Sequence, residues 1–233
     1  MDSRFWVIVP AAGSARRMGA AVPKQYLPLA GRTVIEWSLA PFLERERTGG
    51  VVVVLAEGDR RWPQTDLSRH AKIITTLGGA ERMDSVLAGL KALEARAEPS
   101  DWVLVHDAAR PCLAGADVDR LLNELADDEV GGLLAAPVVD TLKRADAHQR
   151  IDRTVPREKL WRALTPQMFR FELLRRALQS AVENRIAVTD ESQAVEALGL
   201  HPKLVPGDVD NVKITVPEDL PRAEKILRSR GVS

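Results

Sequence analysis

The first stretch whose residue types and spacing favour chemistry lies near the start of the chain. Residues 5–10 form an uninterrupted apolar run that ends in a proline, and the small residues Ala11, Ala12 and Gly13 follow it. This pattern predicts a buried strand that leads into a tight loop. Small side chains leave the backbone N–H groups bare, and Gly13 can adopt a positive φ, so such a loop can approach a phosphate chain closely.

Positive charge follows this loop at once, in Arg16, Arg17 and Lys24. Arginine presents a planar fork of donors and lysine a compact charge, and both can neutralise a polyphosphate. The stretch does not fit a P-loop, and the dinucleotide fingerprint would need glycines where the chain has Ala12 and Ala15. A strand-to-helix turn with a solvated basic flank explains this stretch equally well.

Further polar residues lie at the ends of other apolar runs. Asp107 closely follows the run 102–105, where its carboxylate could hold a hard divalent cation such as Mg²⁺, and Arg110 lies three residues further on. Lys213 lies near Asp210 at the start of a late apolar run. A strand-end aspartate often caps a helix, and a surface lysine is usually only solvated. The combination of Asp107 with Arg110 favours a functional interpretation.

Other residues exclude several kinds of chemistry. His106 has no His or Cys partner at ligand spacing, so we interpret it as structural. Cys112 is the only cysteine, which excludes an intramolecular disulfide and favours a small buried hydrophobe. No Ser-His-Asp ordering or nucleophile elbow is present, which argues against covalent hydrolase chemistry.

Composition gives no sign of a nucleic acid or membrane partner. Lys and Arg together number 33, as do Asp and Glu, so no global field attracts nucleic acid or an anionic membrane. The longest apolar stretches, 5–12 and 130–139, are too short to span a bilayer, and we find no secretory leader. We therefore expect a cytoplasmic protein without nucleic acid or membrane partners.

The elements that must position these residues alternate along the chain. Apolar runs predict strands, and helical spacing of apolar residues predicts the helices between them. The predicted strands are 5–10, 51–55, 73–74, 102–105, 132–137 and 212–216, and the predicted helices are 32–43, 86–93, 118–125, 171–182, 190–198 and one that Pro217 begins. The alternation indicates a single α/β domain over residues 1–233, with a doubly wound, mostly parallel, Rossmann-like sheet that binds its ligand at strand ends.

Residues 138–165 interrupt this alternation. Two short β-like pieces, 141–144 and 150–155, flank the polar turn 146–149 and predict a hairpin with few apolar residues to bury. We interpret the segment as a projecting arm used for dimer contacts. A mobile surface loop is the alternative.

Six blocks of residues occur in one order over nearly the whole chain: 10–13 with 17–19 and 23–26, 78–79 with Arg82 and 85–86, 105–111, 164–167, 189–191 and 211–215. Together they closely resemble the 2-C-methyl-D-erythritol 4-phosphate cytidylyltransferase family. No single block is decisive, but six in register are highly specific.

The resemblance implies a nucleotidyltransferase of the non-mevalonate isoprenoid pathway. Such an enzyme converts CTP and 2-C-methyl-D-erythritol 4-phosphate to 4-diphosphocytidyl-2-C-methyl-D-erythritol and pyrophosphate, with magnesium as cofactor. It also implies a homodimer in which the arm of one subunit helps to complete the other's site. The length leaves no room for a fused cyclase, so we expect a monofunctional enzyme.

Three rivals to this function remain. A cytidylyltransferase acting on ribitol 5-phosphate shares the nucleotide loops and is the nearest alternative. A nucleotide-binding regulatory or scaffold protein without turnover is a second. A dinucleotide-dependent oxidoreductase is distant, because the chain lacks the spaced glycines.

The resemblance also assigns roles to individual residues. The catalytic residues it implies are Arg17, Lys24, Arg157 and Lys213. The CTP-binding residues are Ala11, Ala12, Gly13, Arg17, Lys24, Gly79, Ser85 and Ala108. The residues for methylerythritol phosphate are Asp107, Arg110, Thr141, Arg157, Thr165, Thr189 and Lys213, and Asp107 also serves the metal. Ala15 departs from the glycine common in the family, and Ala80 lacks a polar side chain, so recognition of the base at that point must use the backbone.

Overall fold

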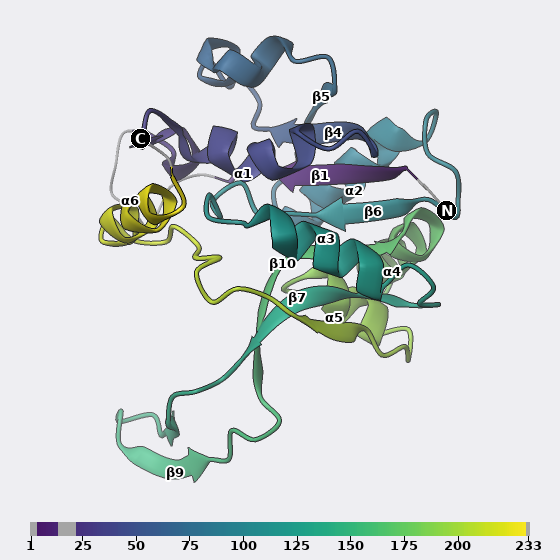
Figure 1. Ribbon diagram of the computed structural model, residues 1–233. Coiled ribbons are helices and arrows are strands. Elements are labelled where there is room, and N and C mark those ends of the chain that lie inside the picture. The colour runs from purple at the N-terminus through teal and green to yellow at the C-terminus, as the bar shows by residue number, and fades with distance from the viewer. Residues whose placement is uncertain (1–3, 14–21, 232–233) are drawn as a thin grey trace.

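The computed structural model describes residues 4–13 and 22–231, and a central β-sheet organises them (Figure 1). In this part of the chain seven strands form one sheet in the order β11-β7-β10-β6-β1-β4-β5. Their bounds are β1 Phe5–Pro10, β4 Thr48–Leu55, β5 Ile73–Leu77, β6 Trp102–Val105, β7 Gly131–Pro137, β10 Trp161–Arg170 and β11 Lys203–Pro206. Two small pieces, β2 (Pro28–Leu29) and β3 (Arg32–Thr33), pair outside it.

Most neighbouring strands in the sheet are parallel. β1 pairs in parallel with β4 and β6, β4 with β5, and β7 with β11, whereas β10 runs antiparallel to β6 and β7. The predicted doubly wound, mostly parallel fold is therefore confirmed. Because parallel strands end at one edge, the loops after β1, β5 and β6 meet there.

Helices cover both faces of the sheet (Figure 1). One face carries α1 (Val34–Leu43) and α3 (Gly115–Glu124). The other carries α2 (Arg82–Leu93), α4 (Phe171–Glu183) and α5 (Glu191–Glu196). The last helix, α6 (Asp219–Ser229), packs with Val34 and Cys112 in a third cluster. Short 3₁₀ turns, Lys24–Tyr26, Trp62–Gln64 and Asp66–Arg69, complete the secondary structure.

The side chains of β1 explain why it lies inside the sheet, between β6 and β4. Phe5, Val7 and Val9 enter the core beneath α1 and α3, while Trp6 and Ile8 enter the core beneath α2 and α4. A strand buried on both faces must be apolar throughout. Each fully buried side chain of this kind stabilises the fold by about 1.5–3 kcal/mol.

The predicted strand 212–216 is wrong. In the structure Ile214 donates its N–H to Ala109 O at 2.8 Å and buries its side chain against α6, without joining a ladder. An apolar pattern marks burial, and here α6 rather than a neighbouring strand supplies the cover. The α6 helix also begins at Asp219, not at Pro217, because the residues before it form a turn in which Asp219 N–H donates to Val216 O at 3.1 Å and Leu220 N–H to Pro217 O at 3.2 Å.

The sheet also contains two strands that the sequence did not predict, β10 and β11. β10 carries Thr165, and its pairing with β7 is interrupted between Ala163 and Gln167. In that interruption Thr165 O accepts a hydrogen bond from the side-chain amide of Asn211 at 2.7 Å. At this point of β10, a hydrogen bond from the Asn211 side chain takes the place of backbone pairing with β7.

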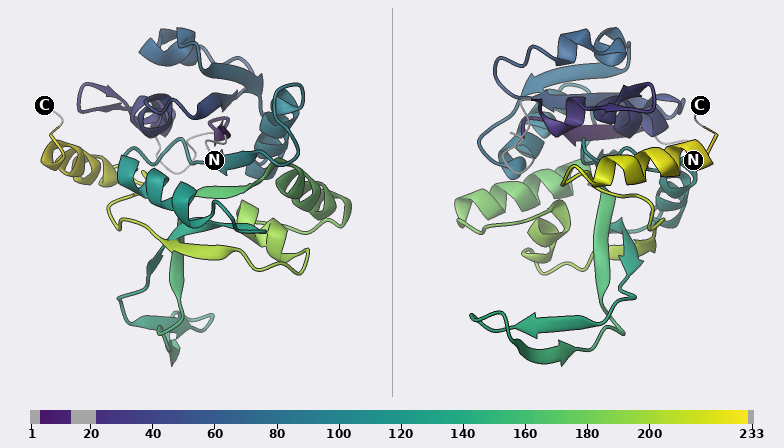
Figure 2. Two further views of the ribbon diagram at one scale, coloured as in Figure 1. Left: turned by 45° about the vertical axis from the view of Figure 1, so that its right-hand side comes forward. Right: turned by 90° about the vertical axis from the view of Figure 1, so that its left-hand side faces the viewer.

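Residues between β7 and β10 form the projecting hairpin. β8 (Leu142–Ala145) and β9 (Ile151–Val155) pair antiparallel outside the main sheet. Figures 1 and 2 show the hairpin extending away from the body of the molecule. Residues 161–163, which we included in the arm, pair with β7 as the start of β10.

Candidate active site

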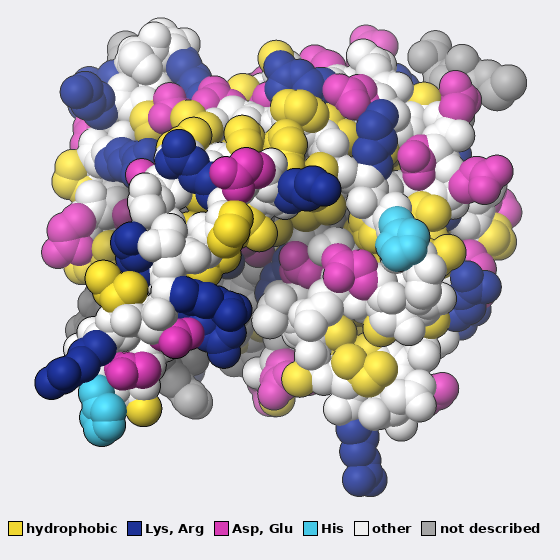
Figure 3. All heavy atoms as spheres, turned by 90° about the horizontal axis from the view of Figure 1, so that it is seen from below, with side chains coloured by type: hydrophobic (Ala, Val, Ile, Leu, Met, Phe, Trp, Pro, Cys, Tyr) yellow, Lys and Arg dark blue, Asp and Glu magenta, His cyan; other side chains and the backbone are white. Residues whose placement is uncertain are grey.

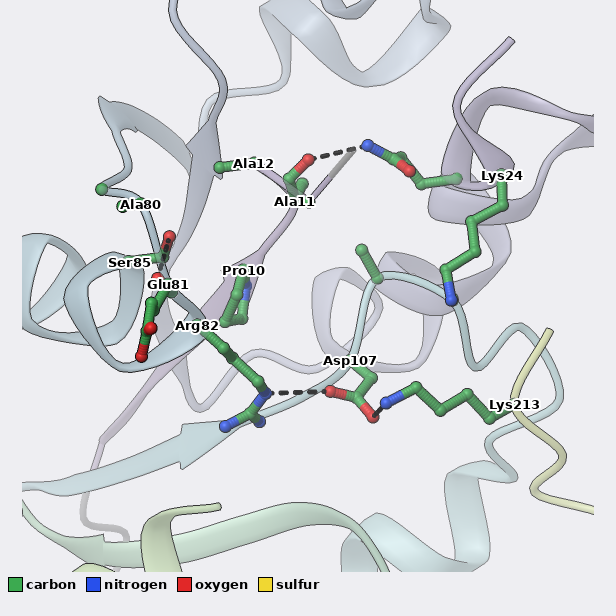
Figure 4. Close-up of a pocket in the computed structure, with 15 residues that line it drawn as sticks. Pro10, Ala11, Ala12, Lys24, Ala80, Glu81, Arg82, Ser85, Asp107 and Lys213 are labelled. Carbon is green, nitrogen blue, oxygen red and sulfur yellow. Dashed lines mark hydrogen bonds and ion pairs between the residues drawn. The ribbon is translucent and has the colours of Figure 1, made fainter. Parts of the chain in front are cut away.

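A pocket opens where the order of the strands reverses. The chain passes from β1 to β4 and β5 on one side and then returns to β6 on the other side of β1, and such switch points are where open α/β sheets bind ligands. The cavity there measures about 300 Å³ (Figure 4). Its lining residues are Pro10, Ala11, Ala12, Gly13, Lys24, Gln25, Gly79, Ala80, Glu81, Arg82, Ser85, Asp107, Ala108, Ala109 and Lys213.

Two loops of small residues form one wall of the pocket. A Cβ on Gly78 would lie 2.7 Å from the Cβ of Ala12 and 2.6 Å from Ser85 Oγ, so only glycine lets these loops approach. Gly13 does not use a positive φ, and a Cβ there would meet open space. The described residues therefore require glycine at position 13 neither for its conformation nor for close packing.

Lys24 enters the pocket from the opposite side (Figure 4). Its Nζ donates to Ile214 O at 2.9 Å. The neighbouring Gln25 donates its side-chain amide to Ala11 O at 2.7 Å, and Tyr26 donates its hydroxyl to Asp59 at 2.6 Å. The Gln25 bond ties the Lys24 segment to the first loop, and the other two bonds tie it to Ile214 and Asp59. The other predicted cations of this region, Arg16 and Arg17, and also Ala15, lie outside the described residues.

Asp107 forms the centre of a charged cluster. Its Oδ1 lies 3.4 Å from Arg82 Nε, and its Oδ2 lies 3.3 Å from Arg110 Nε and 2.9 Å from Lys213 Nζ. Burial raises the pKa of Asp107, but the three cations outweigh it and hold the pKa below its usual value. Asp107 is ionised, and the positive charge around it favours anionic ligands.

A second, smaller cavity of about 180 Å³ adjoins the first. Arg82, Asp107 and Lys213 line both cavities. The other lining residues of the second cavity are Arg110, Ala163, Leu164, Thr165, Gln167, Thr189 and Asp190. Two ligands can therefore meet at one charged wall.

A chain of hydrogen bonds holds Asp107 and Arg110 in place at the charged wall. The N–H of Asp107 donates to Thr165 Oγ1 at 3.2 Å, and that hydroxyl lies 2.9 Å from His106 Nδ1. His106 Nε2 lies 3.2 Å from Arg110 O. His106 is fully buried, and burial lowers its pKa to about 4, which agrees with the structural role we expected.

Two of the predicted substrate residues, Thr141 and Arg157, line neither cavity. Both are exposed in the arm, and Arg157 donates to Val139 O of its own hairpin. Within one chain, the structure therefore brings together the described site residues predicted in the body and leaves those of the arm apart.

Sequence reasoning gave no role to two charged residues of this site. Arg82 was part of a recognised block, and Glu191, which pairs with it, was part of another. Glu191 lay near the start of the predicted helix 190–198, and Arg82 lay in the loop before the predicted helix 86–93, but neither position gave information about the partner of the charged side chain.

The residues of the pocket do not fit a metal ion held by the protein alone. The described residues contain no group of three or more His, Cys, Asp or Glu side chains arranged to hold a metal. Asp107 offers one carboxylate, and its two oxygens already face three cationic side chains. Magnesium usually combines such a single carboxylate with phosphate oxygens of a substrate.

Two further observations concern membranes and surface charge. No helix in residues 4–13 and 22–231 is long and apolar enough to cross a membrane. On the face shown in Figure 3, basic and acidic side chains interleave and form no continuous basic surface.

The fold and the two adjoining cavities define a class of enzyme, the nucleotidyltransferases, in which a nucleotide and an acceptor meet at the switch point of an α/β sheet. Residues 5–229 match the family model described as 2-C-methyl-D-erythritol 4-phosphate cytidylyltransferase. The chain belongs to this family.

Individual relatives agree with this family over nearly their whole length. The protein of that name from Azoarcus sp. (strain BH72) is 55% identical over 229 residues, covering 97% of this chain and 95% of the relative. The crystal structure of the Francisella tularensis protein superposes with a TM-score of 0.84 at 31% identity, covering 96% of this chain and 100% of that one. The structure of the Thermus thermophilus protein gives a TM-score of 0.79 at 35% identity, covering 97% and 99%.

Proposed function

We propose that the chain transfers the cytidylyl group of CTP to the phosphate of 2-C-methyl-D-erythritol 4-phosphate and releases pyrophosphate. The observation that carries this proposal is the wall of Arg82, Asp107 and Lys213 that the two cavities share. A nucleotide in the larger cavity and a sugar-alcohol phosphate in the smaller one would meet at that wall. Membership of the family supports the same reaction.

The larger cavity is proposed to hold CTP. Ala11, Ala12, Gly13, Gly79, Ser85 and Ala108 would contact the nucleotide. Because Ala80 has no polar side chain atoms, backbone groups of these loops would read the base there. Lys24, together with Arg17, would hold the triphosphate.

The smaller cavity is proposed to hold the acceptor. Asp107, Arg110, Thr165, Thr189 and Lys213 line it and would bind methylerythritol phosphate. Asp107 can accept a hydroxyl hydrogen bond of the sugar alcohol because it stays ionised. Lys213 would place the phosphate for attack.

The reaction needs no nucleophile from the protein. A phosphate oxygen of the acceptor forms a bond to the α-phosphorus of CTP, and the bond from that phosphorus to pyrophosphate breaks on the opposite side. Charge grows on the equatorial oxygens, where Lys24 and Arg17 would stabilise it. Cys112 takes no part, since it is buried and its pKa is raised to about 11 by that burial.

Magnesium stays the predicted cofactor, and Asp107 its predicted protein contact. The surroundings of Asp107 favour an ion that enters with the phosphates of CTP over one resident in the protein. A cytoplasmic location also stays a prediction, in keeping with the water-soluble substrates.

We further propose that the active unit is a homodimer joined through the arm. Val139 and Ile151 of the arm are 72% and 67% exposed, which is unusual for aliphatic side chains and favours a partner surface. Thr141 and Arg157 lie on the same hairpin, away from their own cavities. They would therefore complete the site of the second subunit.

An assay of pyrophosphate release tests the reaction. Purified protein is supplied with CTP and magnesium and with either methylerythritol phosphate or ribitol 5-phosphate. Release with methylerythritol phosphate is expected. Faster turnover of ribitol 5-phosphate would instead support that alternative, and CTP binding without release with any acceptor would support a regulatory protein.

Mixed dimers test the role of the arm. Lys24→Ala damages a subunit's own site and leaves its arm intact, whereas Arg157→Ala does the opposite. If arms complete the partner's site, mixing two inactive variants restores about one quarter of the wild-type rate through random pairing. An inactive mixture that nevertheless contains mixed dimers would contradict the proposal.

A further inference from the structure

Arg82 links the two cavities to a buried carboxylate behind them. It lies in the first turn of α2 and reaches across to α5, where both terminal nitrogens of its guanidinium meet the carboxylate of Glu191. The bond from Nη2 to Glu191 Oε2 is 3.0 Å. The remaining Nε faces Asp107 at 3.4 Å (Figure 4). One guanidinium thus pairs with two carboxylates at once.

Glu191 is held rigidly at this position. The residue is 1% exposed, and it opens α5 directly after the N-cap residue Asp190. Gln167 of β10 accepts the N–H of Ser192 at 2.8 Å and donates to Asp190 at 3.0 Å, which fixes the start of α5 to the sheet. A carboxylate buried this deeply requires a cationic partner.

The geometry shows what Glu191 prevents. Asp107 now receives a single N–H of Arg82, because Glu191 occupies the two terminal nitrogens. Without the charge of Glu191, Arg82 can turn and form a two-pronged pair with Asp107. That pair would occupy the carboxylate oxygens that an acceptor hydroxyl needs.

We propose that Glu191 acts through Arg82 as a positioning residue for Asp107, and that it serves the acceptor rather than the nucleotide. The inference depends on the proposed function. Asp190 precedes Glu191 in the chain, and Gln167 anchors the start of α5 to the sheet. Both residues line the acceptor cavity and not the nucleotide cavity. Arg82 and Asp107 line both cavities, so Asp190 and Gln167 are the contacts that distinguish the acceptor side.

Three variants test the proposal. Glu191→Gln keeps the shape of the side chain and removes its charge, and Arg82→Lys keeps a charge but cannot bridge two carboxylates. Asp117→Asn is the matched control, because Asp117 is 3% exposed and pairs with Arg120 at 2.6 Å on α3, outside both cavities. Each variant is measured for kcat/KM of methylerythritol phosphate at saturating CTP, for the Kd of CTP by calorimetry, and for unfolding.

Both site variants are expected to lower kcat/KM for the acceptor by about tenfold or more. Glu191→Gln, whose side chain lines neither cavity, is also expected to change the Kd of CTP by less than about twofold. A double variant that combines Glu191→Gln with Arg82→Lys is expected to have a kcat/KM for the acceptor no lower than that of the less active single variant. The two residues act as one unit, so their effects do not add. The control is expected to lose stability and to keep its acceptor kinetics.

Other outcomes would overturn the proposal. An unchanged kcat/KM for the acceptor, an equal loss of CTP affinity, or the same kinetic loss in Asp117→Asn would each show that Glu191 only supports the fold. If Glu191→Gln does not fold, Arg82→Lys decides by its kcat/KM for the acceptor, compared with that of Asp117→Asn. If the wild-type protein is inactive with methylerythritol phosphate, the proposed function itself is wrong. If the wild-type protein is active and Glu191→Gln has the same kcat/KM for the acceptor, only the proposed role of Glu191 is wrong.

Discussion

His106 should make the stability of this protein strongly dependent on pH. Its ring is fully buried and meets Phe42 edge to face, with the ring centres 5.3 Å apart. Because a carbonyl only accepts hydrogen bonds, Nε2 must carry the proton toward Arg110 O, and Nδ1 accepts from the Thr165 hydroxyl. The structure therefore suits the neutral ring, because protonation would place a charge in a fully buried position and would require the Thr165 hydroxyl to change from donor to acceptor.

The size and the sign of the effect follow from the pKa. Burial lowers the pKa of His106 from 6.5 to about 4, with Asp107 opposing the shift and Arg110 adding to it. Between these values the unfolded chain binds the proton and the folded chain does not, so stability is fully present above about pH 6.5 and falls as the pH drops toward 4. At about 1.4 kcal/mol for each pKa unit, the loss is about 3 kcal/mol.

Urea unfolding at a series of pH values checks this prediction. Wild type, His106→Gln and the control His201→Gln, which alters an exposed histidine, are compared from about pH 7.5 to about pH 4.5. Other groups, such as the carboxylates, titrate in all three proteins. The difference between the proteins in the slope of unfolding free energy against pH therefore isolates the contribution of His106. A shallower slope for His106→Gln than for the control is expected, and parallel slopes for all three proteins would refute the reasoning.

Three further predictions concern the pocket, the core and the arm. Lys24→Ala should lower kcat on the order of 10²–10³-fold with little change in unfolding, because its charge faces the proposed triphosphate, and a variant with the wild-type rate would remove Lys24 from the mechanism. Gly89→Ala should reduce the free energy of unfolding by about 1–3 kcal/mol, since the new Cβ would lie 2.5 Å from Ile8 Cγ2, and an equally stable variant would contradict the tight packing of α2 on β1. Ile151→Asp should shift the dimer toward monomer in light scattering, whereas Ile186→Asp, outside the arm, should not, and a dimer in both would argue against the arm as the interface.

The sequence predicted the parts of the fold that depend on local pattern. The central strands β1, β4 and β6 were visible because a strand buried on both faces must be apolar throughout, as residues 5–10 are. The hairpin was visible from its turn residues. In contrast, β10 contains Arg162, Thr165 and Gln167, so its composition does not resemble a buried strand, although it lies in the middle of the sheet.

The sequence predicted which residues belong to the site better than how they are paired. Asp107 and Lys213 were recognised from blocks far apart in the chain, and the structure brings them to 2.9 Å. The pair of Arg82 with Glu191 joins residues 109 positions apart, and no local pattern encodes such a partner. Likewise, the apolar run around Ile214 marked burial correctly but could not tell a helix cover from a strand ladder.

The interruption in β10 links the arm mechanically to the floor of the smaller cavity. On its arm side the strand is fastened to β7 through Ala163, and on its core side through Gln167, so residues 164–166 form the joint between two stiff sections. Thr165 lies in that joint. If the proposed dimer forms through the arm, a displacement of the hairpin is therefore expected to reach the smaller cavity first at Thr165, which lines it.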